Sequence, residues 1–198
     1  MSTKNFNKKN IFTLSKLRDD ILKCQKCPLK EFPHVPGDGS MNAKVLIVGE
    51  APGKNEAELG LPFVGASGAL LRLFLKQAGF EEDDYYITNA VKCRPMNNST
   101  PGMLHIDACN EHLEREIDYF RPTVILGLGI TASLSLYRDS TPSYRISDYR
   151  GLFYKNTFVG KEYDLFFTYH PAAALYDKSK ESIILNDLKT LNKFLFSK

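Results

Sequence analysis

Residues 45–56 read VLIVGEAPGKNE, an aliphatic run that gives way at Gly49 to a loop with a proline, a second glycine and a lysine. A continuous aliphatic run closed by glycine is typical of a strand buried on both faces of a parallel sheet. Glycine-rich loops at the ends of such strands often cradle phosphates. The first question is therefore whether this loop binds a nucleotide.

The spacing of the loop argues against phosphate binding. A phosphate-binding P-loop has four residues between its glycines, then Lys and a Ser or Thr. Here only residues 50–52 separate Gly49 from Gly53, and Asn55 stands where the hydroxyl is needed. Pro52 also removes a backbone donor, and no GxGxxG opens a helix here. A tight turn explains both glycines, but not why Glu50 follows the strand directly.

The rest of the chain alternates strands with helices. We expect strands at 44–49, 83–91, 123–129 and 162–171, and helices at 11–22, 67–80, 105–120 and 182–196. Residues 138–163 are predicted to form a polar excursion that leaves room for a short hairpin. Strands separated by helices predict an α/β domain with a mainly parallel sheet.

Composition narrows the class of protein. The chain has 198 residues, of which 43% are hydrophobic and 25% charged, values that suit one soluble globular domain. We expect residues 1–10, which are polar and lysine-rich, to be a flexible tail and residues 11–198 to form the domain. No apolar run suits a membrane span or a signal segment, so a cytoplasmic location is expected. The net charge of +3 permits contact with nucleic acid but does not argue for it.

The four cysteines fall at two places in the chain. Cys24 and Cys27 have a spacing that lets two thiolates reach one metal ion or cluster iron, and Cys93 and Cys109 supply two more. In a reducing cytosol four cysteines are more typical of metal ligands than of disulfides, with ordinary buried thiols as the alternative. The pattern predicts a metal centre, and the spacing alone does not choose between zinc and a four-iron cluster.

Four side chains are predicted to meet at one edge of the sheet. The carboxyl ends of parallel strands form the edge where ligands bind in such folds. Glu50, Asn89 and His170 each follow or end a predicted strand, and Phe63 lies in the loop after the first of them. Taken singly, Phe63 is as well explained as a core residue, Asn89 as a cap and His170 as a structural histidine. Their shared location favours a site.

Five separated motifs then resemble those of one known family. They are GEAPG at 49–53, LPFVGASG at 61–68, ITNAVKCRP at 87–95, ACNEHL at 108–113 and YHPAAAL at 169–175. In this order, and with the cysteine pattern, the chain resembles the family 4 uracil-DNA glycosylases, the iron-sulfur branch of their superfamily. The resemblance runs from about Leu14 to the C-terminal helix.

The resemblance carries expectations for the fold, the cofactor and the partner. It implies a three-layer α/β/α sandwich around a short, mainly parallel sheet. It also implies a structural [4Fe-4S] cluster that ties the N-terminal helix to the body. The enzyme would flip deoxyuridine out of DNA as a monomer and hydrolyse the N-glycosidic bond, leaving an abasic site. The cluster ligands implied are Cys24, Cys27, Cys93 and Cys109.

It also assigns roles in the base pocket. By this comparison His170 donates to uracil O2, helped by the backbone N–H near Ala51, which stabilises the departing base. Asn89 reads the N3 and O4 edge that separates uracil from cytosine. Phe63 stacks on the flipped base, and Glu56 lies against C5, where a thymine methyl would clash.

The resemblance leaves two features of the site less defined. Glu50 is a catalytic-site residue that orients water or shapes the pocket, and the residues do not choose between these roles. The segment from Ala172 to Leu175 matches a loop that enters the DNA minor groove, with Leu175 as a wedge or, alternatively, a core residue at a helix start. A non-catalytic iron-sulfur DNA-binding protein of the same fold is the main rival, and a zinc-stapled nucleotide-binding enzyme is the second.

Overall fold

The computed structural model describes residues 13–137 and 142–196. The tail expected at 1–10 and the start of the helix expected from Ile11 lie outside these residues. The described chain forms a six-stranded sheet in the order β1-β3-β2-β4-β6-β5. The strands are β1 Asp38–Gly39, β2 Val45–Gly49, β3 Tyr85–Asn89, β4 Val124–Leu128, β5 Phe153–Phe158 and β6 Lys161–Thr168.

The inner strands of the sheet are parallel and its edges are antiparallel. Strands β3, β2, β4 and β6 pair in parallel, whereas β1 and β5 pair antiparallel with β3 and β6. From β2 the chain passes to β3 on one side and later to β4 on the other. This change of direction opens a crevice at the carboxyl ends of β2 and β4, where α/β folds bind ligands.

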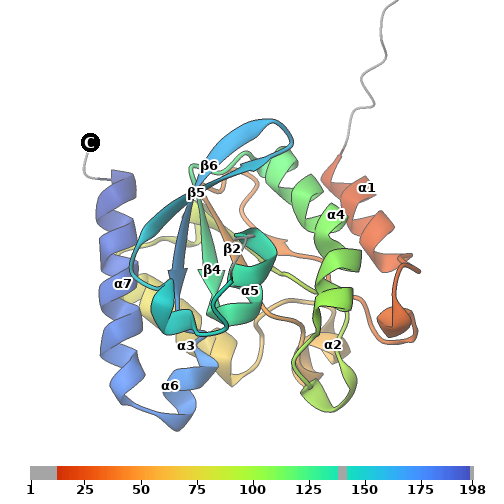
Figure 1. The fold of residues 1–198 in the computed structure, drawn as a ribbon, viewed down its shortest axis with the longest axis horizontal. Coiled ribbons are helices and arrows are strands. Elements are labelled where there is room, and N and C mark those ends of the chain that lie inside the picture. Colours follow the sequence, from red (N-terminus) through yellow and green to blue (C-terminus); the bar gives the residue numbers. More distant parts are fainter. Residues whose placement is uncertain (1–12, 138–141, 197–198) are drawn as a thin grey trace, which may run out of the picture.

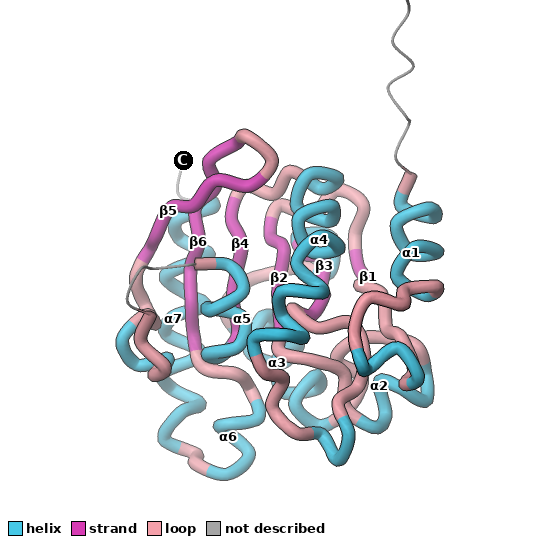
Figure 2. Tube along the Cα trace, turned by 45° about the vertical axis from the view of Figure 1, so that its right-hand side comes forward, coloured by secondary structure: helices cyan, strands magenta, loops and turns pink. Residues whose placement is uncertain are grey.

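Helices cover both faces of the sheet (Figure 1). Figure 2 shows α4 and α5 in front of the strands and α3 and α7 behind them, with α1 beside α4. This confirms the three-layer α/β/α sandwich with a mainly parallel sheet. The helices are α1 Leu14–Leu22, α2 Lys54–Leu59, α3 Ala66–Gln77, α4 Met103–Phe120, α5 Gly129–Leu136, α6 Ala172–Tyr176 and α7 Ser179–Phe196, and short 3-10 turns occupy Pro28–Glu31, Glu82–Asp84, Met96–Asn98 and Ile146–Asp148.

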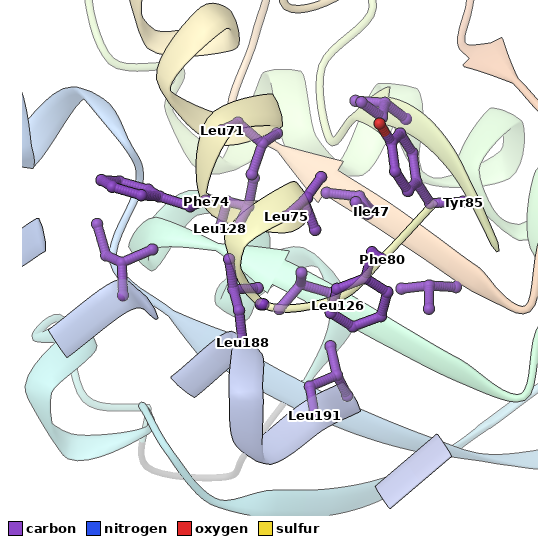
Figure 3. Close-up of a cluster of buried hydrophobic side chains, with 14 of the residues drawn as sticks. Ile47, Leu71, Phe74, Leu75, Phe80, Tyr85, Leu126, Leu128, Leu188 and Leu191 are labelled. Atoms are coloured by element: carbon purple, nitrogen blue, oxygen red, sulfur yellow. The ribbon is translucent and has the colours of Figure 1, made fainter. Parts of the chain in front are cut away.

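The aliphatic run of β2 explains why two cores form. Successive side chains of a strand point to opposite faces, so Val45 and Ile47 pack under α3 and α7, while Leu46 and Val48 pack under α4 and α5. Figure 3 shows the first core, where Leu71 of α3 and other apolar side chains close over the sheet. A fully buried side chain of this kind contributes about 1.5–3 kcal/mol to stability.

The expected elements match the observed ones, and the additions are short. The hairpin left open within 138–163 is formed by β5 and β6, joined by Val159 and Gly160 with φ of 48° and 75°. Helices α2 and α5 each follow a loop or strand end and were not anticipated, whereas α6 contains Leu175, for which a helix start was the alternative expectation. Among the described residues, no helix has both the length and the apolar character needed to cross a membrane.

Candidate active site

A pocket of about 240 Å³ lies at the carboxyl edge of the sheet, the lower edge in Figure 1, near α6. It gathers seven of the residues singled out from the sequence: Glu50, Ala51, Glu56, Phe63, Asn89, His170 and Ala172. They come from four separate segments of the chain. The parallel register of the strands brings these segments to one edge, as the strand order required.

Asn89 ends β3 beside Gly49, the last residue of β2. Its side chain is 2% exposed, and its Oδ1 has no hydrogen-bond partner among the described residues. An unpaired buried acceptor is unfavourable unless a ligand completes it. Gly49 makes room for this amide, because a Cβ at that position would lie 2.5 Å from Asn89 Oδ1 and 2.5 Å from the Phe63 ring.

Phe63 is held in an unusual backbone conformation. Its φ of 55° lies in the left-handed region, which is uncommon for a bulky residue. The Arg72 guanidinium donates to the Phe63 carbonyl at 2.5 Å. Gly68 lets that carbonyl approach α3, since a Cβ there would lie 1.8 Å from it. The ring is thereby fixed in the pocket, with its centroid 5.6 Å from that of the His170 ring.

His170 follows β6 and lines the pocket. The Ala172 N–H donates to Nδ1 at 3.2 Å, so Nδ1 is the acceptor and Nε2 bears the hydrogen of the neutral ring. Burial lowers the pKa of His170 to about 4, opposed by the nearby Glu56 carboxylate. At neutral pH the imidazole is therefore uncharged and offers one N–H donor.

The two pocket carboxylates are both anchored. Glu56, 8% exposed, accepts a hydrogen bond from the Gly65 N–H at 2.8 Å. Glu50 accepts one at 2.6 Å from the hydroxyl of Thr131 in α5, across the crevice between β2 and β4. Lys54, the residue that resembled a phosphate ligand, is exposed and faces Glu58 at 3.9 Å. The loop therefore presents acids, not a cation, to the pocket.

The segment after His170 forms the short helix α6. Ala172 lines the pocket, whereas Leu175 is 50% exposed and outside the lining. Exposure of Leu175 overturns the alternative that it is a core residue. Its neighbour Tyr176 is 91% exposed, a feature that the sequence did not single out. Two large side chains thus project into solvent beside the pocket.

Sequence reasoning missed several residues of the pocket wall. Ser67, Pro95, Asn98 and Ser99 also line it. Proline and asparagine mark the 95–99 segment as a turn, but nothing in the sequence places that turn over the pocket. Asn98 has a φ of 54°, and its Oδ1 accepts from Arg94 Nε at 2.8 Å. Thr131 was missed as well, since it lies two residues beyond the strand expected at 123–129.

Three of the four cysteines meet at a small apolar cluster, and Cys24 lies near enough for its charge to act on Cys93. Cys93 and Cys109 are buried in the cluster, and Cys27 packs against it. Burial, together with the neighbouring charges of Cys109, Cys27 and Cys24, raises the pKa of the Cys93 thiol to about 12. Among the described residues, no three His, Cys, Asp or Glu side chains converge as a single metal ion requires.

Ala51 connects this cysteine region with the pocket. It lines the pocket on one side and packs against the cluster that contains Cys93 and Cys109 on the other. The carbonyl of Glu50 also accepts a hydrogen bond from Val91 N–H at 3.0 Å. A structural change in the cysteine region would therefore displace the start of the GEAPG loop.

Comparison with known proteins agrees with this arrangement. The family model described as "Uracil DNA glycosylase superfamily" matches residues 36–194. The chain is 40% identical over 185 residues to a type-4 uracil-DNA glycosylase of Sulfurisphaera tokodaii, covering 91% of this chain and 84% of the relative. It is 42% identical over 165 residues to the type-4 enzyme of Pyrobaculum aerophilum, covering 82% and 84%. It is 37% identical over 179 residues to the type-4 enzyme of Thermotoga maritima, covering 88% of this chain and 91% of the relative.

Proposed function

The chain belongs to the uracil DNA glycosylase superfamily, and we propose that it is an iron-sulfur enzyme of type 4 that flips deoxyuridine out of DNA. It excises uracil by hydrolysing the N-glycosidic bond, so that a water oxygen replaces the base on C1′ and leaves an abasic site. One observation carries the pocket assignment: Asn89, which lines the pocket with Phe63 and His170, has a buried Oδ1 with no hydrogen-bond partner among the residues that the structure describes.

The neutral His170 suits the departing base. Cleavage gives the sugar oxocarbenium character and places negative charge on uracil. In our proposal Nε2–H donates to uracil O2 as this charge develops, together with the backbone N–H near Ala51. A neutral donor needs no proton uptake before the reaction. The pKa of about 4 for His170 supports this role at physiological pH.

Asn89 separates uracil from cytosine by the direction of two hydrogen bonds. Its Oδ1 accepts from N3–H of uracil and its Nδ2 donates to O4. Cytosine presents an acceptor at N3 and a donor at N4, so both contacts would be mismatched. Rejection by mismatched buried polar groups is the strong form of discrimination. The buried Oδ1 supports this proposal, because no donor within residues 13–137 and 142–196 satisfies it.

Phe63 and Glu56 complete the base pocket in this proposal. The fixed Phe63 ring stacks on the flipped base, a contact that holds any pyrimidine. Glu56 lies against C5, where a methyl group would meet its carboxylate. The bond from Gly65 N–H supports this role, because it keeps the Glu56 side chain from moving aside.

We assign the positioning of the attacking water to Glu50. A carboxylate accepts hydrogen bonds from water and so orients its lone pair toward C1′. The bond from Thr131 holds one oxygen of Glu50 in place. Beside the pocket, Ala172 and the exposed Leu175 would enter the minor groove, with Leu175 filling the space that the flipped base vacates.

The cysteines are proposed to hold a structural [4Fe-4S] cluster. Such a cluster takes four thiolates, each on its own iron, so its ligands surround a body larger than one ion. Cys24 and Cys27 follow α1, and Cys93 and Cys109 belong to the β3–α4 region. The cluster would thus tie α1 to the body. We further propose one domain over residues 11–198 that acts as a cytoplasmic monomer.

The deciding experiment uses an oligonucleotide with a single uracil, treated with enzyme and then alkali. We expect strand cleavage at uracil and little at thymine, and a large loss of activity in Asn89→Ala and in His170→Ala. Binding of the oligonucleotide without cleavage, in both single-stranded and double-stranded form, would favour the rival non-catalytic DNA-binding protein and overturn the proposal.

A further inference from the structure

A fully buried ion pair lies beside the base pocket. The side chains of Lys92 and Glu116 are 1% and 0% exposed, and Lys92 Nζ donates to Glu116 Oε2 at 2.6 Å. Two charges in the protein interior lose their hydration, and an apolar pair of similar volume is often at least as stable. Stability alone therefore gives little reason for this pair.

The ammonium group of Lys92 has every donor engaged. Besides Glu116 it donates to the Thr88 hydroxyl at 2.7 Å and to the main-chain carbonyl of Asn89 at 2.6 Å. Thr88 in turn donates to the Glu116 carboxylate at 3.0 Å. Lys92, Glu116 and Thr88 thus form a closed network, which we call the Lys92 network, in which no member can move alone.

The Lys92 network holds the main chain of Asn89. On one side the Ala90 N–H donates to the Gly49 carbonyl at 2.9 Å, which keeps the end of β3 beside β2. On the other side the Lys92 ammonium group donates a hydrogen bond to the Asn89 carbonyl. Both bonds belong to the peptide group between Asn89 and Ala90, which is therefore fixed at its N–H and at its carbonyl, and this limits the direction in which the Asn89 side chain leaves the backbone. Asn89 lines the pocket, and its buried Oδ1 has no hydrogen-bond partner in the part of the chain that the structure describes.

The same segment also reaches the cysteine region. The Lys92 N–H points to Cys109 Sγ at 3.5 Å. Cys109 and Glu116 are seven residues apart on α4, so they share one face of the helix. Helix α4 is therefore attached to the end of β3 by the contact with the Cys109 thiol and by the Lys92–Glu116 pair. An experiment that changes the ion pair must also verify that the cysteine region is intact.

We propose that Lys92 is a positioning residue for uracil recognition. Together with Glu116 and Thr88 it fixes the Asn89 peptide so that the side-chain amide meets N3–H and O4 of the flipped base. This inference rests on the proposed role of Asn89 in reading the base. Misplacing a reacting or recognition group by about 1 Å can cost on the order of 100-fold in rate.

The test is the double variant Lys92→Met/Glu116→Gln, which removes both charges and leaves none unpaired. We expect kcat on a single-stranded uracil oligonucleotide to fall roughly 10- to 100-fold, with KM changed less than about 3-fold. The thermal midpoint and the visible absorbance of the iron-loaded protein should be retained. The control is Lys155→Met/Glu162→Gln on the β5–β6 hairpin, where the exposed Lys155 contacts Glu162 at 3.2 Å and Asp164 at 3.0 Å; this variant should keep the wild-type kcat.

A cycle with Asn89→Ala distinguishes positioning from general damage. If the Lys92 network acts through Asn89, adding its variant to Asn89→Ala costs little more. Fully additive losses, or a folded double variant with wild-type kcat, would overturn the proposal. If Lys92→Met/Glu116→Gln does not fold, the same cycle with Asn89→Ala is measured with Thr88→Val, which leaves Lys92 and Glu116 paired. Thr88→Ser, which keeps the hydroxyl, is then the control. Wild-type enzyme that releases no uracil would contradict the proposed function instead, before any variant is compared.

Discussion

The hydroxyl of Thr131 donates a 2.6 Å hydrogen bond to the carboxylate of Glu50. The two residues are far apart in sequence, and the bond spans the carboxyl ends of β2 and β4. Thr131 is 2% exposed, so water does not compete freely for its partner. The orientation of Glu50 is therefore set by a helix that follows a different strand.

Replacing Thr131 by Val removes this donor with little change of volume. A hydrogen bond to a charged group contributes about 1.5–3 kcal/mol, so we expect kcat to fall roughly 10- to 100-fold. Single-turnover kinetics on a uracil oligonucleotide measure the effect, and Thr131→Ser, which keeps the hydroxyl, is the control. A wild-type kcat in the Val variant would show that the Thr131–Glu50 hydrogen bond does not contribute to the reaction rate.

A methyl group at Gly49 is expected to disable the pocket. Its Cβ would lie 2.5 Å from both Asn89 Oδ1 and the Phe63 ring, so one of them must move. Gly49→Ala should lose most activity, and overpacking should lower its stability by about 1–3 kcal/mol. Denaturant unfolding and glycosylase assays measure the two effects. Gly102→Ala is the control, since nothing lies within 4 Å of a Cβ there. Equal activity of the two variants would contradict the packing argument.

The pH dependence of the rate reports the protonation of His170. Its pKa of about 4 is lower than in the unfolded chain, so the neutral ring predominates above about pH 4. We expect a rate that is flat from about pH 8 down to about pH 5 and that decreases as the pH approaches 4. The unfolded chain binds this proton first, so stability also falls as pH drops from about 6.5 toward 4. A rate that rises as pH falls through 6.5 would indicate that the imidazolium is the active form.

Shortening Glu56 should relax the discrimination against thymine. Glu56→Ala removes the carboxylate proposed to meet the C5 methyl and frees the Gly65 N–H. We expect the ratio of kcat/KM for uracil over thymine to decrease at least about 10-fold, the scale of a one-methyl contact in a pocket. Glu58→Ala, on the same helix but exposed, should leave the ratio unchanged. An unaltered ratio in Glu56→Ala would assign thymine rejection to another residue.

Substitution of the cysteines tests the proposed cluster without an activity assay. Protein purified without air should be brown and hold about four irons per chain, and Cys109→Ser should lose most of both. Loss of a bound group that stabilises only the folded state lowers the thermal midpoint. Colourless protein that holds one zinc would favour the zinc interpretation, and metal-free protein with an unchanged midpoint would indicate ordinary buried thiols.

The main elements of the fold were predictable, because each carries its own pattern. The run at 45–49 and the helical spacing in α7 are local signals that tertiary packing reinforces. Helix α5 was not anticipated, since GITASLSL contains glycine, serine and threonine, which are weak helix formers. It forms because Ala132 and Leu136 pack into the core under β2 and β6. Helices α2 and α6 are too short for a periodic pattern to emerge.

The sequence by itself determined the fold class, the family and the identity of the residues at the sheet edge. These follow from short-range patterns, namely aliphatic runs, strand ends and motif order. The tertiary structure alone decided which groups hold those residues in place. Thr131 reaches Glu50, Arg72 reaches Phe63, and the Lys92 network reaches Asn89. The Thr131–Glu50 contact and the Lys92–Glu116 pair join segments that are distant in the sequence and meet only in the folded sheet. Arg72 and Phe63, and Lys92 and Asn89, are nine and three residues apart, in a loop and at a strand end that no periodic pattern describes. The segment VLIVGEAPGKNE therefore specifies a strand and two carboxylates of the pocket. The helices around it determine how the pocket side chains are oriented.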